Sequence, residues 1–170
     1  MKYFLLSVII VASGMLISSA YAAVYLSSPS TCSGSWASCN YAFSSNDFYA
    51  QTSGGYSGIW GDYGFNISTT TGTSTASTTV QIGVEGKAAV CPGSAVISVA
   101  ISRDGGANFG PYHSRTFGCA DSMEWVDVTN DYSPWSASDF SNANLKVKAK
   151  CEQGGVYCDL DWLPVKVDIP

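Results

Sequence analysis

The sequence predicts an all-β fold: a single antiparallel β-sandwich, jelly-roll-like and stapled by disulfides. Three observations lead to this prediction. Apolar residues recur at every second position in several short segments, whereas helical periodicity is nearly absent. Turn-forming residues such as Asp104-Gly105-Gly106 separate these segments. The chain also has six cysteines, an even number, which pair by default in an oxidising compartment.

The first 22 residues predict export. Lys2 precedes an apolar run that ends near Ile17, and small residues up to Ala22 follow in an A-x-A pattern. This is the pattern of a secretory signal peptide, and the run is too short for a stable membrane span. A retained anchor is the alternative. We therefore expect a secreted or cell-surface protein with three parts: a signal peptide (1–22), an extended N-terminal segment (23–30) and one β-sandwich domain (31–170).

Strand alternation is clearest in the segment 145–151, where apolar residues share one face and three lysines share the other. That pattern predicts a strand with one wet face. Pro164 separates two alternating runs of opposite phase, so we expect a bulge or an edge position there. The tract 68–79, with seven threonines and three serines, is expected to be a loop or an exposed edge. The other expected elements are strands at 47–52, 63–67, 80–84, 95–101, 112–119, 123–128, 160–162 and 165–169, and a serine-capped helical turn at 136–140.

The spacing of the cysteines favours one pairing. Two pairs are each separated by seven residues and would close local loops, which leaves the remaining two cysteines as a longer pair. Gly154-Gly155 predicts a tight turn between Cys151 and Cys158, so we expect that disulfide to close a hairpin. A metal site made of cysteines is disfavoured, because the chain has no C-x-x-C motif and a single histidine. The predicted disulfides are Cys32–Cys39, Cys151–Cys158 and Cys91–Cys119.

Composition argues against several classes of partner. Without Lys2, seven basic residues stand against 13 acidic ones. Nucleic acid and anionic lipid both need a basic face on the protein, so neither is expected as a partner. Only 12% of the residues are charged, which fits a polar, weakly ionic surface such as those of proteins that work outside the cell.

No catalytic constellation is recognisable, so we do not expect an enzyme. His113 is the only histidine, and neither G-x-S-x-G nor H-E-x-x-H occurs. Asp159 and Asp161 share a strand face, as a glycosidase pair could, but we interpret them as solvated carboxylates that point outward. No cofactor is predicted. The alternative is a calcium ion held by Asp47 or Asp131 with loop carbonyls.

Aromatic residues outside the expected core make glycans candidate ligands. The candidate platform residues are Trp36, inside the small disulfide loop, and Trp60 with Tyr56 and Tyr63. Aromatic side chains are often core residues instead, so this interpretation requires that the four be exposed. Asn66, in the sequon Asn-Ile-Ser, is the glycosylation candidate.

The order of several short motifs resembles a β-sandwich module of secreted prokaryotic surface proteins. The resemblance covers about residues 36–169 and implies the fold and a surface location, but little about mechanism. The chain departs from the usual pattern in its cysteines and in the Thr-rich tract. By architecture alone, it is also similar to archaeal surface filaments built by donor-strand exchange. The motifs are Asn46–Ala50, Tyr63–Phe65, Val80–Gly86, Val99–Gly106, Asp131–Trp135, Ser138–Val147 and Leu160–Trp162.

The segment 23–30 leads to the functional expectation. It is a strand-prone stretch that ends at a strand-breaking proline, Pro29. If it completes a groove in a neighbouring copy, Val24 and Leu26 point into that neighbour and Tyr25 faces away. Repeated head to tail, this contact builds a pilus-like filament or matrix, and the protein is a structural subunit. The alternatives are a first strand of its own sheet in a secreted carbohydrate-binding or adhesive module and, third, a virion surface protein.

Overall fold

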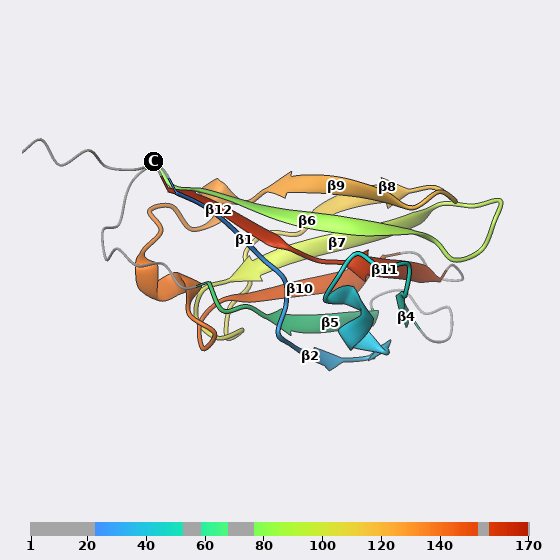
Figure 1. The fold of residues 1–170 in the computed structure, drawn as a ribbon, viewed down its shortest axis with the longest axis horizontal. Coiled ribbons are helices and arrows are strands. Elements are labelled where there is room, and N and C mark those ends of the chain that lie inside the picture. The colour runs from blue at the N-terminus through green and yellow to red at the C-terminus, as the bar shows by residue number, and fades with distance from the viewer. Residues whose placement is uncertain (1–22, 53–58, 68–76, 153–156, 170) are drawn as a thin grey trace, which may run out of the picture.

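The protein is described by a computed structural model at residues 23–52, 59–67, 77–152 and 157–169. The predicted signal peptide, the platform candidate Tyr56 and most of the Thr-rich tract lie outside these residues. Two antiparallel sheets pack face to face, which confirms the predicted β-sandwich (Figure 1). In the part of the chain that is described, no helix is long and apolar enough to cross a bilayer.

The first sheet is built around its longest strand, β6. Both β11 and β12 pair with the same edge of β6, and their register shifts near Trp162, close to the phase change that Pro164 predicts. Gly83 N–H donates to Pro164 O at 2.8 Å, so the chain between β11 and β12 stays hydrogen-bonded to β6. The strand order is β1 (Ala23–Ser27), β12 (Val165–Ile169), β6 (Thr79–Ala88), β11 (Cys158–Trp162), β4 (Ala50–Thr52) and β3 (Trp36–Ala37), with β9 (Ser122–Asp127) on the other edge of β6.

The second sheet, called here sheet B, has five strands. Its middle strand shows the predicted alternation, since Val147, Ala149 and Cys151 are fully buried and the lysines between them face outward. The strand order is β2 (Thr31–Gly34), β5 (Ile59–Gly64), β10 (Lys146–Cys151), β7 (Ala95–Ser102) and β8 (His113–Phe117). Within the described ranges, three 3-10 turns lie between strands: η1 (Cys39–Ala42), η2 (Thr129–Asp131) and η3 (Ala137–Phe140). The predicted serine cap is present at η3, where Ser136 and Asp139 form a capping box.

The core lies between the sheets, and the apolar faces predicted for β6, β7 and β10 are buried in it. Alternation alone would put Leu160 and Trp162 on one face of β11, but the register shifts between them. Leu160 is buried, whereas Trp162 is only half-buried and its Nε1–H donates to Ser28 Oγ at 2.9 Å. Trp135 is fully buried, whereas Trp125 on β9 is 37% exposed. Burial of each large apolar side chain stabilises the fold by about 1.5–3 kcal/mol. The fully buried β6 and β7 side chains include Val80, Ile82, Val84, Ile97, Val99 and Ile101.

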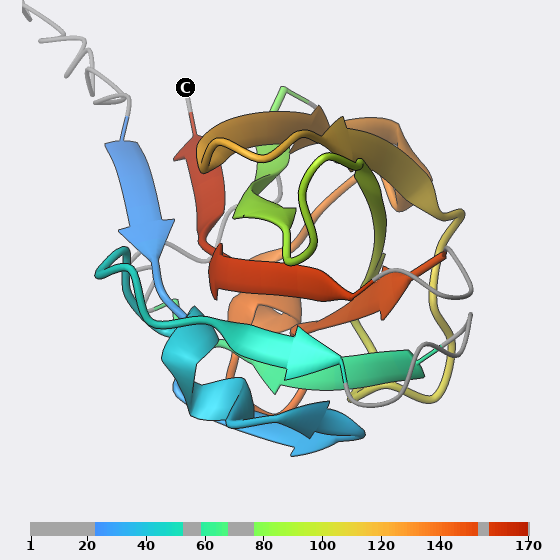
Figure 2. The ribbon, with the colours of Figure 1, turned by 90° about the vertical axis from the view of Figure 1, so that its right-hand side faces the viewer.

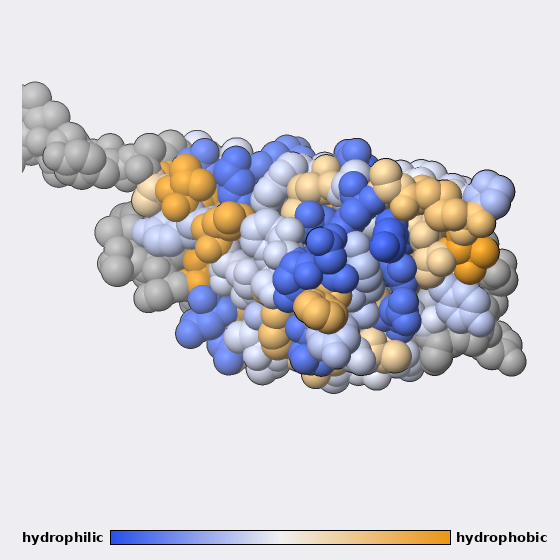
Figure 3. Space-filling model, turned by 45° about the vertical axis from the view of Figure 1, so that its right-hand side comes forward, coloured by the Kyte–Doolittle hydropathy of each residue, from blue (hydrophilic) through white to orange (hydrophobic). Residues whose placement is uncertain are grey.

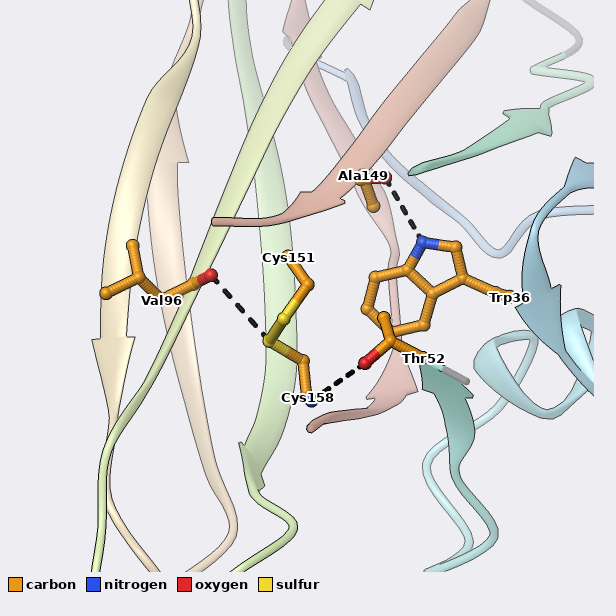
Figure 4. Close-up of a disulfide and its surroundings, with 6 residues drawn as sticks. All are labelled: Trp36, Thr52, Val96, Ala149, Cys151 and Cys158. Atoms are coloured by element: carbon orange, nitrogen blue, oxygen red, sulfur yellow. Dashed lines mark hydrogen bonds between the residues drawn. A yellow bond between two sulfur atoms is a disulfide. The ribbon is translucent and has the colours of Figure 1, made fainter. Parts of the chain in front are cut away.

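The three predicted disulfides are present: Cys32–Cys39, Cys91–Cys119 and Cys151–Cys158. The last was expected to close a hairpin, and that expectation is wrong. Cys151 ends β10 in sheet B, whereas Cys158 begins β11 in the first sheet, so the bond joins the two sheets inside the core (Figure 4). Cys158 N–H donates to Thr52 Oγ1 at 3.2 Å and fixes β11 beside β4.

The N-terminal strand β1 belongs to the first sheet of its own chain. It pairs antiparallel with β12, from Ala23 opposite Ile169 to Ser27 opposite Val165 (Figure 2). Tyr25 packs against the core, whereas Val24 and Leu26 are 60% and 56% exposed. The donor-strand prediction concerns a neighbouring copy of the chain, and it stays a prediction. Because Tyr25 pairs with inward-facing Val167, alternation turns its two neighbours outward.

Candidate functional site

The outer face of sheet B brings aromatic and charged side chains together along β5 and β10. Alternation places Trp60, Asp62 and Gly64 of β5 on this face, and the three β10 lysines lie on the same face. The register sets Lys150 opposite Trp60, Lys148 opposite Asp62 and Lys146 opposite Gly64. We call the three β10 lysines and the β5 residues opposite them the lysine row. The sequence signal for the lysine row was the alternation of lysines in 145–151, which predicted only a strand face in contact with water.

Lys148 ties the aromatic residues of this face to one another. Its Nζ lies 4.4 Å from the ring centroid of Trp60, 4.2 Å from that of Phe109 and 3.7 Å from Asp62 Oδ1. Such cation–π contacts are worth about 0.5–1 kcal/mol at exposed sites. They favour one orientation of the Trp60 ring, while 42% of this residue stays exposed. An exposed ring whose motion is already restricted loses less entropy when a ligand stacks on it.

A second exposed aromatic ring lies on the side of the β10 lysines that faces away from Trp60. Tyr112, 47% exposed, lies beside Lys150, whose Nζ is 5.5 Å from the ring centroid and 2.8 Å from Glu152 Oε2. Tyr112 and Phe109 come from the β7–β8 connection, and neither was predicted as a site residue from the sequence. That connection contains Gly105 and Gly106 near its start, both with positive φ as the turn motif predicts.

At the Gly64 end of β5 the face deepens into a hollow of about 230 Å³. Burial raises the pKa of Asp62 at its edge, although the ammonium of Lys148 opposes this. The hollow is smaller than a typical ligand pocket of about 300–1,000 Å³, so it suits one polar group or ring of a larger ligand. Its lining residues are Thr31, Cys32, Ser33, Asp62, Gly64, Gly105, Gly106 and Lys146.

The predicted aromatic platform is only partly present. Trp60 is exposed, but Trp36 and Tyr63 are buried in the core, so the expectation that they are exposed is wrong. Trp36 Nε1–H donates to Ala149 O at 3.3 Å beneath sheet B (Figure 4). Trp60 and Tyr63 are three positions apart on one strand, so alternation puts them on opposite faces. That rule, applied to 59–64, would have separated them.

Carboxylates gather on the outer face of the first sheet. Oxygen atoms of Asp47, Asp121 and Asp161 lie within 4.8 Å of one another. Asp161 is buried and accepts N–H groups of Asn46 and Asp47 at 3.2 Å. Burial raises the pKa of Glu85 on β6, and the charges of the three aspartates add to this. Carboxylate oxygens in such a group are the ligand type that calcium prefers.

Two sequence expectations change at this cluster. Asp159 and Asp161 were expected to point into water, but both are buried. The reason is that the segment 43–51 covers them, and Gln51 Nε2 donates to Asp159 Oδ1 at 2.9 Å. Asp131, the other calcium candidate, lies apart from this cluster and pairs instead with His113 Nε2 at 3.0 Å.

The surface drawn in Figure 3 is mainly hydrophilic, and its hydrophobic residues form separate small patches. Isolated patches of this kind are ordinary for a protein surface. Asn66, the glycosylation candidate, is exposed just after β5, between buried Phe65 and Ile67. Its modification stays a prediction.

Comparison with known proteins gives one kind of likeness. No protein-family profile and no curated protein sequence matches this chain. Among the solved structures that resemble it is TmCBM61 in complex with beta-1,4-galactotriose, with a TM-score of 0.38 and 9% sequence identity over 84% of this chain and 86% of that chain. At this similarity, the ligand of one chain says nothing about the ligand of the other.

Proposed function

We propose that this protein is an exported, non-catalytic carbohydrate-binding module whose ligand lies along β5 on the outer face of sheet B. One observation carries the proposal: Trp60 is exposed and contacted by Lys148, and a polar hollow lies farther along the same strand. A flat ring can stack on the C–H face of a sugar, while neighbouring polar groups bind its hydroxyls. The three disulfides support export, since such bonds persist in oxidising compartments.

The experiment is a glycan-array screen of the mature protein, followed by calorimetric titration of the glycans that bind. Replacing Trp60 by Ala should weaken binding at least about tenfold, because stacking is lost while the fold remains. Trp125→Ala is the matched control, since Trp125 is similarly exposed but belongs to β9 on the other sheet. Binding that Trp60→Ala leaves intact, or an array without a single hit, contradicts the proposal.

Assembly into filaments through β1 has less support, because β1 pairs with β12 of its own chain. The exposed side chains of Val24 and Leu26 are compatible with contacts to other molecules at the edge of the first sheet. We therefore keep self-assembly as the second proposal. Light scattering or negative-stain microscopy of the mature protein tests it directly.

We also propose that the carboxylates of Asp47, Asp121 and Asp161, together with Glu85, can bind calcium. The cluster brings four negative charges close together, which a divalent cation would offset. Calcium should then raise the melting temperature relative to EDTA by mass action. Asp121→Asn should reduce this rise, whereas Asp168→Asn, on β12, should not. Equal melting temperatures in calcium and EDTA would rule the site out.

A further inference from the structure

Lys146 differs from the other two lysines on the outer face of sheet B. Lys148 pairs with Asp62, and Lys150 pairs with Glu152. Among the described residues, no carboxylate lies within ion-pair distance of Lys146. Its Nζ donates to the backbone oxygen of Asn142 at 3.2 Å. An ammonium group has three N–H donors, so Lys146 keeps donor capacity for a ligand.

Lys146 directs this capacity into the hollow beside Gly64. A Cβ atom added to Gly64 would collide with Thr31 Oγ1 and would lie 2.6 Å from Lys146 Nζ. The absence of a side chain on Gly64 therefore makes room for the Lys146 ammonium and the Thr31 hydroxyl, which meet over the backbone of Gly64 in the wall of the hollow. Ser33, also in the lining, adds a second hydroxyl. Two kinds of donor that meet at one point suit an acceptor with several oxygen atoms.

The hollow and the aromatic platform lie on one line. Gly64 follows Trp60 by four residues on β5, which is about 13 Å at about 3.3 Å per residue. This separation is longer than one sugar ring, so a ligand that reaches both must be an oligosaccharide. A ring stacked on Trp60 would then set the position of a group at Lys146.

We infer that the outer face of sheet B binds an acidic oligosaccharide: a sugar ring stacks on Trp60, and a carboxylate or sulfate group on a neighbouring sugar contacts Lys146 and Thr31. This inference rests on the proposed carbohydrate-binding function and narrows it to a ligand class. Asp62, the nearest carboxylate in the hollow, is paired with Lys148, which offsets its repulsion of an anion. Without Lys2, seven basic and 13 acidic residues leave a net charge of −6. This net charge acts mainly at longer range, and salt screens interactions between exposed charges beyond about 8 Å.

The test compares matched glycans on one array: neutral chains and the same backbones bearing carboxylate or sulfate groups. We expect hits among the acidic members. Carboxyl reduction or desulfation of each hit then shows which anion is bound. Lys146→Gln should weaken binding of the acidic hit about tenfold and reduce its salt dependence. Lys166→Gln, on β12 of the other sheet, is the control and should leave both unchanged.

The possible failures are distinguishable. The acidic-ligand inference fails if only neutral glycans bind. It also fails if the Lys146→Gln variant binds the acidic glycans as tightly as the wild type does. Either result leaves the carbohydrate-binding function standing. An array without hits overturns both. Circular dichroism of Lys146→Gln should match the wild type, since Lys146 faces outward; if it does not, Thr31→Val provides the second variant, with a smaller loss of acidic-glycan affinity expected.

Discussion

The two faces of β5 have different surroundings: the inner face packs in the core, and the outer face is partly exposed. On the inner face, Tyr63 is completely buried, and a Cβ at Gly61 would press on Trp36. On the outer face, Trp60 and Asp62 contact Lys148 and water. Residues one position apart therefore serve the core on one side and, under the proposed function, ligand contact on the other. Substitutions at neighbouring positions should change different measured quantities, and the predictions below test that separation from the largest effect on stability to the smallest.

The largest effect is expected on the inner face of β5. Tyr63→Ala should lower the free energy of unfolding by about 3–5 kcal/mol, as measured by urea denaturation, because it leaves a cavity between the sheets. Tyr63→Phe is the control. Among the described atoms, the buried Tyr63 Oη has no hydrogen-bond partner, so its removal should leave stability unchanged or raise it by up to about 1 kcal/mol. A clear loss in Tyr63→Phe would mean that the hydroxyl has a partner after all.

The same comparison applies to β1 and decides between its two interpretations. Tyr25→Ala should cost about 2 kcal/mol, because this side chain packs against the core of its own domain. Leu26→Lys should cost less than about 0.5 kcal/mol, since Leu26 is exposed. Thermal unfolding with sedimentation analysis measures both. The donor-strand interpretation requires the reverse: Leu26→Lys abolishes assembly, and Tyr25→Ala leaves the monomer unaffected.

Trp36, Asp159 and the β7–β8 connection show which parts of the fold and of the candidate site could not be predicted from the sequence. The alternation of apolar residues was sufficient for the sandwich, for most strands and for the core faces of β7 and β10. It could not place Trp36, because β3 is only two residues long and its direction depends on pairing with β4. Nor could it show that 43–51 folds over Asp159, since cover by a loop is a tertiary contact. The contacts of Phe109 with Lys148 and of Tyr112 with Lys150 depend on the long β7–β8 connection, which returns both rings to the outer face of sheet B.

A smaller effect on the free energy of unfolding is expected at Trp60. Trp60→Ala should cost less than about 1 kcal/mol of stability, because only a half-exposed ring and its cation–π contact are lost. Trp36→Ala, by contrast, should cost about 3–5 kcal/mol. Iodide quenching of fluorescence gives an independent reading. It should reach Trp60 and Trp125 and leave Trp36 and Trp135 protected, and equal quenching of all of them would contradict the assigned faces.

The smallest effect concerns the charge on Asp62. Burial raises its pKa above the ordinary value of 3.8, although Lys148 opposes the shift. Between the ordinary and the raised value, the folded state binds more protons than the unfolded state, so this group makes stability fall as pH rises. Asp62→Asn removes the contribution. The stability of the variant relative to the wild type should therefore increase with pH across this window in a series of denaturation curves. A decrease would mean that the Lys148 ion pair dominates.

The pairing of Ala23 with Ile169 has a mechanical consequence. These residues face each other at the corner where β1 begins and β12 ends (Figure 1). Tension applied through them would load the β1–β12 ladder from its open end, so the residue pairs would separate one after another. Peeling would then reach Cys32, whose bond to Cys39 keeps the residues between the two cysteines from being pulled straight. Under such a pull, the five residue pairs between β1 and β12 are the first to be loaded.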